Sequence, residues 1–154
     1  MFLAADVGCS KTESSRVADE RPNFSGRWNF SADDSALQIA QPDDVEVVIE
    51  HKDSSFRLAR TLTFGDRRDE FELALTIGDE AKQLARGNAV LYPAIQWDGE
   101  QLEFLTKIVK EDDESTNKVR YHLEKDGTVM IADEQYRGPE LSYDNRWVFT
   151  KIEN

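Results

Sequence analysis

The sequence has a single cysteine, Cys9, among its 154 residues, and only two histidines. One cysteine excludes a disulfide within the chain and a zinc site built from several cysteines. No apolar run approaches the roughly 20 residues that cross a bilayer as a helix, so we expect no transmembrane segment. The length is typical of one domain with a full hydrophobic core.

Positive charge is also scarce. The chain has 19 Lys and Arg against 31 Asp and Glu, which gives a formal net charge of -12. Phosphate groups repel such a surface, so the composition argues against nucleic acid and anionic membranes as partners. The sequence also lacks the catalytic Ser/His/Asp order, a paired-carboxylate motif, a glycine-rich phosphate loop and metal-ligand spacing. We therefore expect no cofactor and no metal, and an enzyme is the weaker expectation.

Residues 1–22 are predicted to form a flexible leader that precedes a single domain over residues 23–154. The segment Val7-Gly8-Cys9 is similar to the small-residue cleavage site of bacterial lipoproteins, although Asp6 interrupts the apolar run before it. Two alternatives stay open. Either Cys9 is processed and lipid-anchored on an exported protein, periplasmic or secreted, or the leader is a disordered arm on a cytoplasmic protein.

From Val45 onward, apolar and polar residues alternate in short segments that turn-forming residues separate. Such alternation predicts strands with one buried face. Four hairpins follow from the turn residues, centred on Asp53-Ser54, Arg67-Arg68, Asp98-Gly99 and Asp126-Gly127. In these registers the expected cross-strand partners are His51 with Phe56, Phe64 with Phe71, Ile95 with Leu102, and Leu123 with Met130.

About eight to ten strands joined by tight hairpins, with no long helix, form an antiparallel meander. A meander with one apolar face on each strand has to roll up in order to hide that face. The sequence therefore predicts an all-β protein, an up-and-down antiparallel β-barrel. A two-layer sandwich is the alternative, but it needs longer crossovers than the spacing provides.

The stretch Phe24-Ser25-Gly26-Arg27-Trp28 resembles the Gly-x-Trp motif that opens lipocalin-like (calycin) barrels, and Arg146 resembles the basic residue of the last strand that lies over that Trp. Val48-Ile49-Glu50-His51-Lys52 and Trp147-Val148-Phe149-Thr150-Lys151 are similar to segments of small bacterial lipocalin-like proteins. The resemblance implies a ligand-binding barrel in which Gly26, Trp28 and Arg146 form a structural plug at one end.

Arg60 is the most informative residue for function, because its strand places it among apolar residues of the inner face. A buried guanidinium needs a partner. That partner is either a carboxylate of the chain, with Glu134 the best candidate, or the acidic group of a bound ligand. The candidate ligand-binding residues, which share the predicted interior or its rim, are Arg60, Phe56, Leu58, Leu73, Phe104, Tyr121, Glu134 and His51.

We expect a non-enzymatic barrel that binds a small hydrophobic or amphipathic molecule, for which a carboxylate is a candidate group, as a monomer or weak dimer. The alternative is an accessory module with a filled core, which would meet a protein partner through its acidic exterior or a loop. A third, weaker option is an enzyme that isomerises or dehydrates a bound ligand. A cavity favours the first hypothesis, and a closed core favours the second.

Overall fold

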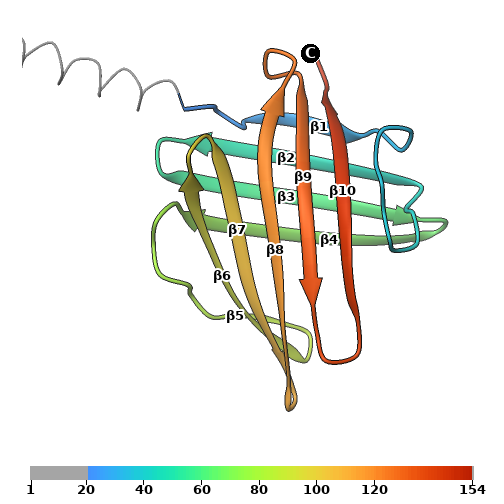
Figure 1. The fold of residues 1–154 in the computed structure, drawn as a ribbon, viewed down its shortest axis with the longest axis vertical. Helices are drawn as coiled ribbons and strands as arrows, with labels where there is room; N and C mark the ends of the chain where they lie inside the picture. Colours follow the sequence, from blue (N-terminus) through green and yellow to red (C-terminus); the bar gives the residue numbers. More distant parts are fainter. Residues whose placement is uncertain (1–20, 154) are drawn as a thin grey trace, which may run out of the picture.

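The computed structural model describes residues 21–153, which form one antiparallel sheet of ten strands (Figure 1). The strands are β1 (Gly26–Phe30), β2 (Asp44–Lys52), β3 (Ser55–Phe64), β4 (Arg67–Thr76), β5 (Leu84–Arg86), β6 (Ala89–Asp98), β7 (Gln101–Lys110), β8 (Asp113–Glu124), β9 (Val129–Arg137) and β10 (Ser142–Lys151). The described residues contain no helix, and none therefore that would be long and apolar enough to span a bilayer. The all-β prediction is confirmed.

The sheet is curled into an up-and-down barrel that stays open along one line. Its strand order is β4-β3-β2-β1-β10-β9-β8-β7-β6-β5, so β1 joins the N-terminal strands to the C-terminal ones. Figure 1 shows β2, β3 and β4 crossing behind β8, β9 and β10. The two ends of the order, β4 and β5, are not hydrogen-bonded to each other as strands. We call the line between them the seam.

Two of the four predicted hairpin registers are confirmed. Residue His51 pairs with Phe56 across the turn Asp53-Ser54, and Leu123 pairs with Met130 across the turn that contains Asp126-Gly127. Inward and outward faces of β2, β3, β8 and β9 therefore follow the predicted alternation.

The other two predicted registers are wrong. In the β3–β4 hairpin Phe64 pairs with Arg67, because the turn lies at Gly65-Asp66. In the β6–β7 hairpin Trp97 pairs with Leu102. In both turns a glycine with positive φ, Gly65 at 57° or Gly99 at 64°, takes the first of the two turn positions, which is where a type II′ turn needs it. Both errors move the pairing by an even number of residues, so the inner and outer faces stay as predicted.

One half of the barrel is filled by aromatic residues around Trp28. The Trp28 and Phe24 side chains are fully buried, and the Trp28 indole N–H donates to the Phe24 carbonyl at 3.0 Å. The cation over the indole is Lys151, whose Nζ lies 5.7 Å from the ring centroid. A Cβ on Gly26, whose φ is 146°, would lie only 2.7 Å from Lys151 Cε, so this glycine makes room for the lysine stem.

The predicted contact between Trp28 and Arg146 is wrong. Trp28 pairs directly with Lys151 across β1 and β10, while Arg146 has the opposite parity from the inward-facing Trp147. Alternate residues of a strand point to opposite faces, so Arg146 is directed outward. The resemblance to Gly-x-Trp barrels identified the correct tryptophan but the wrong cation.

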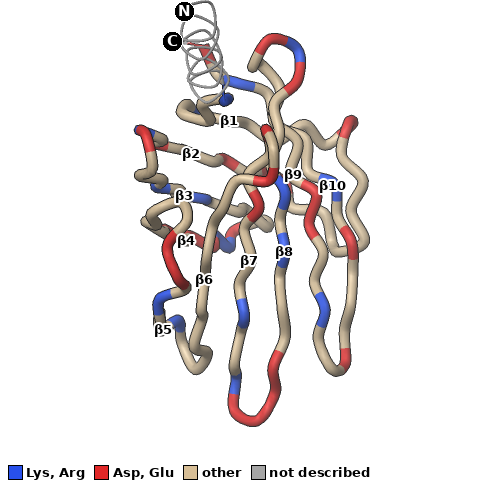
Figure 2. The backbone as a smooth tube through the Cα atoms, turned by 60° about the vertical axis from the view of Figure 1, so that its left-hand side comes forward, with Lys and Arg blue, Asp and Glu red and all other residues tan. Residues whose placement is uncertain are grey.

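Residues 31–43 connect β1 to β2 without a helix and run beside β10. The Ala36 N–H donates to the Arg146 carbonyl at 2.9 Å, and the Arg146 N–H donates back to the Ala36 carbonyl at 2.8 Å. Figure 2 marks acidic residues along the backbone at the turn between β7 and β8, where residues 111–114 are exposed, as expected of a solvated run. The leader 1–22, with Cys9, lies almost wholly outside the described residues.

Candidate functional site

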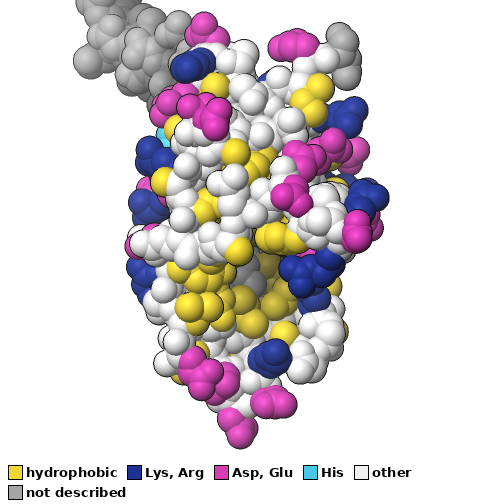
Figure 3. Space-filling model, turned by 90° about the vertical axis from the view of Figure 1, so that its right-hand side faces the viewer, with side chains coloured by type: hydrophobic (Ala, Val, Ile, Leu, Met, Phe, Trp, Pro, Cys, Tyr) yellow, Lys and Arg dark blue, Asp and Glu magenta, His cyan; other side chains and the backbone are white. Residues whose placement is uncertain are grey.

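A cavity of about 120 Å³ lies in the half of the barrel away from Trp28. Side chains from seven strands line it, and most of them are apolar. Its lining comprises Val45, Val47, Leu58, Arg60, Leu62, Phe71, Leu73, Phe104, Thr106, Asn117, Val119, Tyr121, Ala132, Glu134, Trp147 and Phe149. An apolar cavity of about 150 Å³ holds one benzene molecule, so this one suits a single ring or a short chain. Figure 3 shows hydrophobic side chains around a hollow on one side of the molecule, with Lys or Arg beside them.

Arg60 is held loosely on the β3 wall of the cavity. It forms an ion pair with Asp69 on β4, with Nη2 to Oδ2 at 3.5 Å, at the outer limit of a hydrogen bond. The Arg60 Nε atom is buried and has no hydrogen-bond partner among the described residues. A buried donor without an acceptor is costly, and such a donor at a cavity wall is available to a ligand.

Asp69 is shared with a second guanidinium from the other side of the seam. Arg86 on β5 donates to Asp69 Oδ1 at 2.9 Å, a shorter contact than that of Arg60. Both guanidinium groups lie over the Phe71 ring, with Arg86 at 4.5 Å and Arg60 at 5.4 Å from its centroid. Two cations around one carboxylate leave this wall of the cavity with an excess of positive charge.

Glu134 does not form the predicted ion pair with Arg60. Its Oε1 accepts the Trp147 indole N–H and the Asn145 amide N–H, both at 2.9 Å. These neutral donors come from β10, the strand that pairs with β9 at Glu134. In the described residues no cation lies within ion-pair distance of this carboxylate, so it brings an unpaired negative charge to the cavity wall.

Asn117 on β8 is a site residue that sequence reasoning missed. Its side chain lines the cavity, and its buried Oδ1 has no hydrogen-bond donor among the described residues. The signal was present in the sequence, because Asn117 shares the inward parity of Val119 and Tyr121. A polar residue among apolar residues that face the interior indicates a binding site, as Arg60 does. Asn117 was overlooked because its side chain carries no charge.

The Tyr121 hydroxyl is close enough to both Arg60 and Glu134 to be affected by their charges. Burial raises the pKa of its phenol, while Arg60 lowers that pKa and Glu134 raises it. Burial likewise raises the pKa of Tyr143 to about 12, and Glu134 adds to the rise. Both tyrosines are neutral hydroxyl groups at ordinary pH.

The structure brings together most of the predicted ligand-binding residues. Leu58, Leu73, Phe104 and Tyr121 line the cavity with Arg60 and Glu134.

Two predicted residues, His51 and Phe56, do not line the cavity and belong to the filled half. His51 is buried between Phe24 and Trp97, and its Nδ1 accepts the Phe24 backbone N–H at 3.2 Å. It lies inside the barrel where we expected it near the rim.

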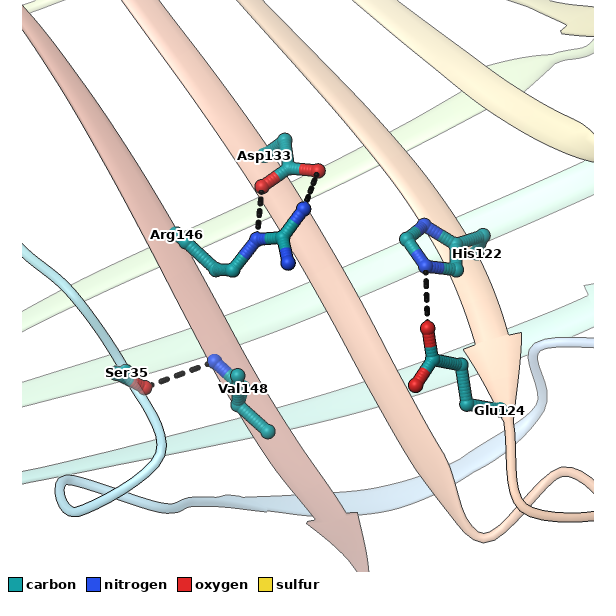
Figure 4. A network of polar contacts seen from close by, with 6 residues as sticks. All are labelled: Ser35, His122, Glu124, Asp133, Arg146 and Val148. Atoms are coloured by element: carbon teal, nitrogen blue, oxygen red, sulfur yellow. Dashed lines mark hydrogen bonds and ion pairs between the residues drawn. The ribbon is translucent and has the colours of Figure 1, made fainter.

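Arg146 takes part in polar contacts on the outer face of β8, β9 and β10 (Figure 4). Its Nε and Nη2 donate to the two carboxylate oxygens of Asp133 at 2.7 and 3.0 Å. On the same face His122 contacts Glu124 at 3.1 Å, and Ser35 Oγ accepts the Val148 N–H at 2.9 Å. None of these residues lines the cavity, and in the described residues no group of acidic, His or Cys side chains is arranged to hold a metal ion.

Comparison with known proteins finds likeness at the level of structure. No family model and no curated protein sequence matches the chain. Human cRBP IV is 15% identical with a TM-score of 0.57, over 85% of this chain and 99% of that one. Secretory abundant heat soluble protein 4 from Ramazzottius varieornatus is 18% identical with a TM-score of 0.53, over 84% of this chain and 95% of that one.

The same organism provides a further secretory abundant heat soluble protein, 11% identical with a TM-score of 0.58, over 83% of this chain and 94% of that one. The fold is lipocalin-like. The lipocalin-like barrel of this chain aligns with these structures over almost their whole length. At such low identities the likeness is one of fold, and the chemistry of the site has to come from its own residues.

Proposed function

We propose that this chain is a non-enzymatic binding protein for a small amphipathic acid, which it holds in the barrel cavity. The observation that carries the proposal is the buried Arg60 Nε, a donor that finds no acceptor within residues 21–153 and lies at the wall of a mostly apolar cavity. A carboxylate on the ligand would give that donor its partner. The short chain or ring behind the carboxylate would lie against Leu58, Leu73 and Phe104.

The cavity also supports this hypothesis over that of a module with a filled core. The interior is filled around Trp28, whereas the part of the barrel that contains Arg60 has room for a ligand. Ligand pockets for drug-sized molecules have volumes of roughly 300–1,000 Å³. A volume of about 120 Å³ therefore points to a small acid such as benzoate or hexanoate.

The test is an NMR titration of the protein with hexanoate and with benzoate. We expect the Arg60 side-chain N–H resonance to shift downfield on binding, since it gains a charge-assisted hydrogen bond. The variant Arg60→Met should weaken binding by about tenfold or more, because a hydrogen bond to a charged group contributes about 1.5–3 kcal/mol.

The matched control is Arg57→Met, which removes the same charge from the exposed outer face of the same strand. It should leave the affinity for both acids unchanged. If neither acid binds the unmodified protein, or if both variants bind as well as it does, the proposed function is wrong.

A further inference from the structure

The polar groups of the cavity are divided between two opposite walls. The donor, Arg60 Nε, belongs to β3, while the acceptors, Asn117 Oδ1 and the Glu134 carboxylate, belong to the neighbouring strands β8 and β9. In the order of the curled sheet, four strands separate β3 from β8, which places them on opposite sides of the barrel. The cavity is therefore polarised, with a positive donor wall and a negative acceptor wall.

The two acceptors lie close enough to serve one group. Glu134 pairs with Val119, and Asn117 is two residues before Val119 on the same face of β8. Diagonal neighbours on one face of an antiparallel pair are about 7–8 Å apart, and their side chains reach a shared partner. Neither acceptor has a cation within reach among the described residues.

From this polarity we infer that the ligand carries a hydrogen-bond donor at the end opposite its carboxylate, and that this donor is an amino group. The inference rests on the proposed function, because it takes the acid group at Arg60 as given. An ammonium group has three N–H donors and a positive charge. It can satisfy the Asn117 oxygen and the Glu134 carboxylate together, whereas a hydroxyl group can donate to one of them only.

Charge balance favours the same class of ligand. A lone anionic acid would neutralise the excess charge at Arg60 and leave the partly buried Glu134 carboxylate with only the neutral Asn145 and Trp147 donors. Unpaired charge in such surroundings is unfavourable. An amino acid with its two charged groups at the ends of a short apolar chain would place its carboxylate at Arg60 and its ammonium group at Glu134. It would add no net charge to the barrel.

The experiment compares three homologous series of small acids by calorimetry or NMR titration. These are unbranched acids, the corresponding ω-hydroxy acids and the corresponding ω-amino acids, matched in chain length. At the best-fitting length we expect the amino acid to bind about tenfold more tightly than the unsubstituted acid, with the hydroxy acid between them.

Two variants of the acceptor wall test its role. Glu134→Gln keeps an oxygen for the Trp147 and Asn145 donors, so the fold should persist while the preference for the amino acid is lost. Asn117→Leu should reduce that preference independently. The matched control is Glu72→Gln on the exposed outer face of β4, which should leave the preference intact.

The outcomes separate this inference from the proposed function. If the unsubstituted acids bind with dependence on Arg60 but no amino acid of any length binds better, the inference is overturned and the proposed function stands. If the preference exists and survives both Glu134→Gln and Asn117→Leu, the inference is likewise overturned. If no acid in any series binds, both fail.

Discussion

At the scale of single residues, the polar side chains of the interior divide into those with partners and those without. His51 has its partners, a backbone N–H at Nδ1 and the Asp53 carbonyl near Nε2. Arg60 and Asn117 each keep one buried atom without a partner in the part of the chain that the structure describes. Strand parity places all three on the inner face, although the sequence analysis did not single out Asn117, and no sequence pattern says which of them finds a partner inside the protein. That depends on distances between strands far apart in the chain.

Acid should destabilise this protein through His51. Burial lowers the pKa of this imidazole below its usual value, and the Asp53 carbonyl and carboxylate oppose the shift only in part. Between the two pKa values the unfolded chain binds more protons than the folded one, so stability rises with pH there. We expect the His51 contribution to be complete above about pH 6.5 and to be lost as pH falls through the folded-state value.

The measurement is urea unfolding between neutral and mildly acidic pH, compared with the variant His51→Gln. The variant should lose less stability over this range than the unmodified protein. The variant His122→Gln, which removes the outward-facing histidine, should still show the loss due to His51. Equal slopes for the unmodified protein and His51→Gln would contradict the expectation.

At the scale of strands and turns, the sequence predicted which side chains face inward more reliably than it predicted which residues pair across a hairpin. Alternation fixed which side chains of β3, β4, β6 and β7 point inward, because side chains on a strand repeat every two residues. It placed one turn two residues late, at Arg67-Arg68 in place of Gly65-Asp66, and the other one residue early, at Asp98-Gly99 in place of Gly99-Glu100, since the flanking charged residues are equally suited to a turn. The glycines decide, because a positive φ is strained for residues with a Cβ. A glycine between two strands is thus a better guide to the turn than the charges beside it.

The ion pairs at the seam should restrain Arg60. Asp69 on β4 holds Arg60 at 3.5 Å and Arg86 at 2.9 Å, and so competes with any acidic ligand for the Arg60 guanidinium. The variant Asp69→Asn removes that competitor. We therefore expect it to bind hexanoate several-fold more tightly, with a stability change below about 1 kcal/mol because the pairs are partly exposed.

Calorimetric titration and thermal unfolding of the Asp69→Asn variant give both quantities. The matched control is Glu70→Gln, which neutralises the next carboxylate of β4, on its outer face. It should leave the affinity unchanged. Weaker binding by Asp69→Asn would mean that Asp69 positions Arg60 for the ligand and does not compete with it.

At the scale of the whole molecule, the barrel divides into a packed half and a hollow half. The packed half contains Phe24, Trp28, His51, Phe56 and Trp97, and the hollow half contains the cavity with Arg60. Sequence alone predicted the curled sheet and the central role of Trp28. It could not predict the hollow, because an apolar inner face has the same pattern whether opposite walls touch or not.

Truncation of Trp28 should therefore reduce stability without removing the site. Trp28 is fully buried and does not line the cavity. Loss of a large buried aromatic side chain costs about 3–5 kcal/mol. For a chain of this size that lowers the melting temperature of Trp28→Ala by about 10 °C.

Thermal unfolding followed by circular dichroism gives the melting temperature, and titration below the transition gives the affinity for hexanoate. The affinity should stay within about twofold of that of the unmodified protein. A control, Trp147→Phe, alters an indole that lines the cavity and should change binding more than stability. An unchanged melting temperature for Trp28→Ala would show that the packed half does not depend on this indole.

The seam leaves an exposed strand edge, β4, through which copies of the protein could associate. An unpaired strand edge is a template on which another chain can add a strand, and long apolar edges lead to aggregation. Along β4, five of the first six residues, from Arg67 to Glu72, carry charge, and only Phe71 interrupts them. Neighbouring copies would have to strip water from these charges before their backbones could pair. The charges on β4 should therefore prevent the open barrel from assembling into fibres through this strand edge.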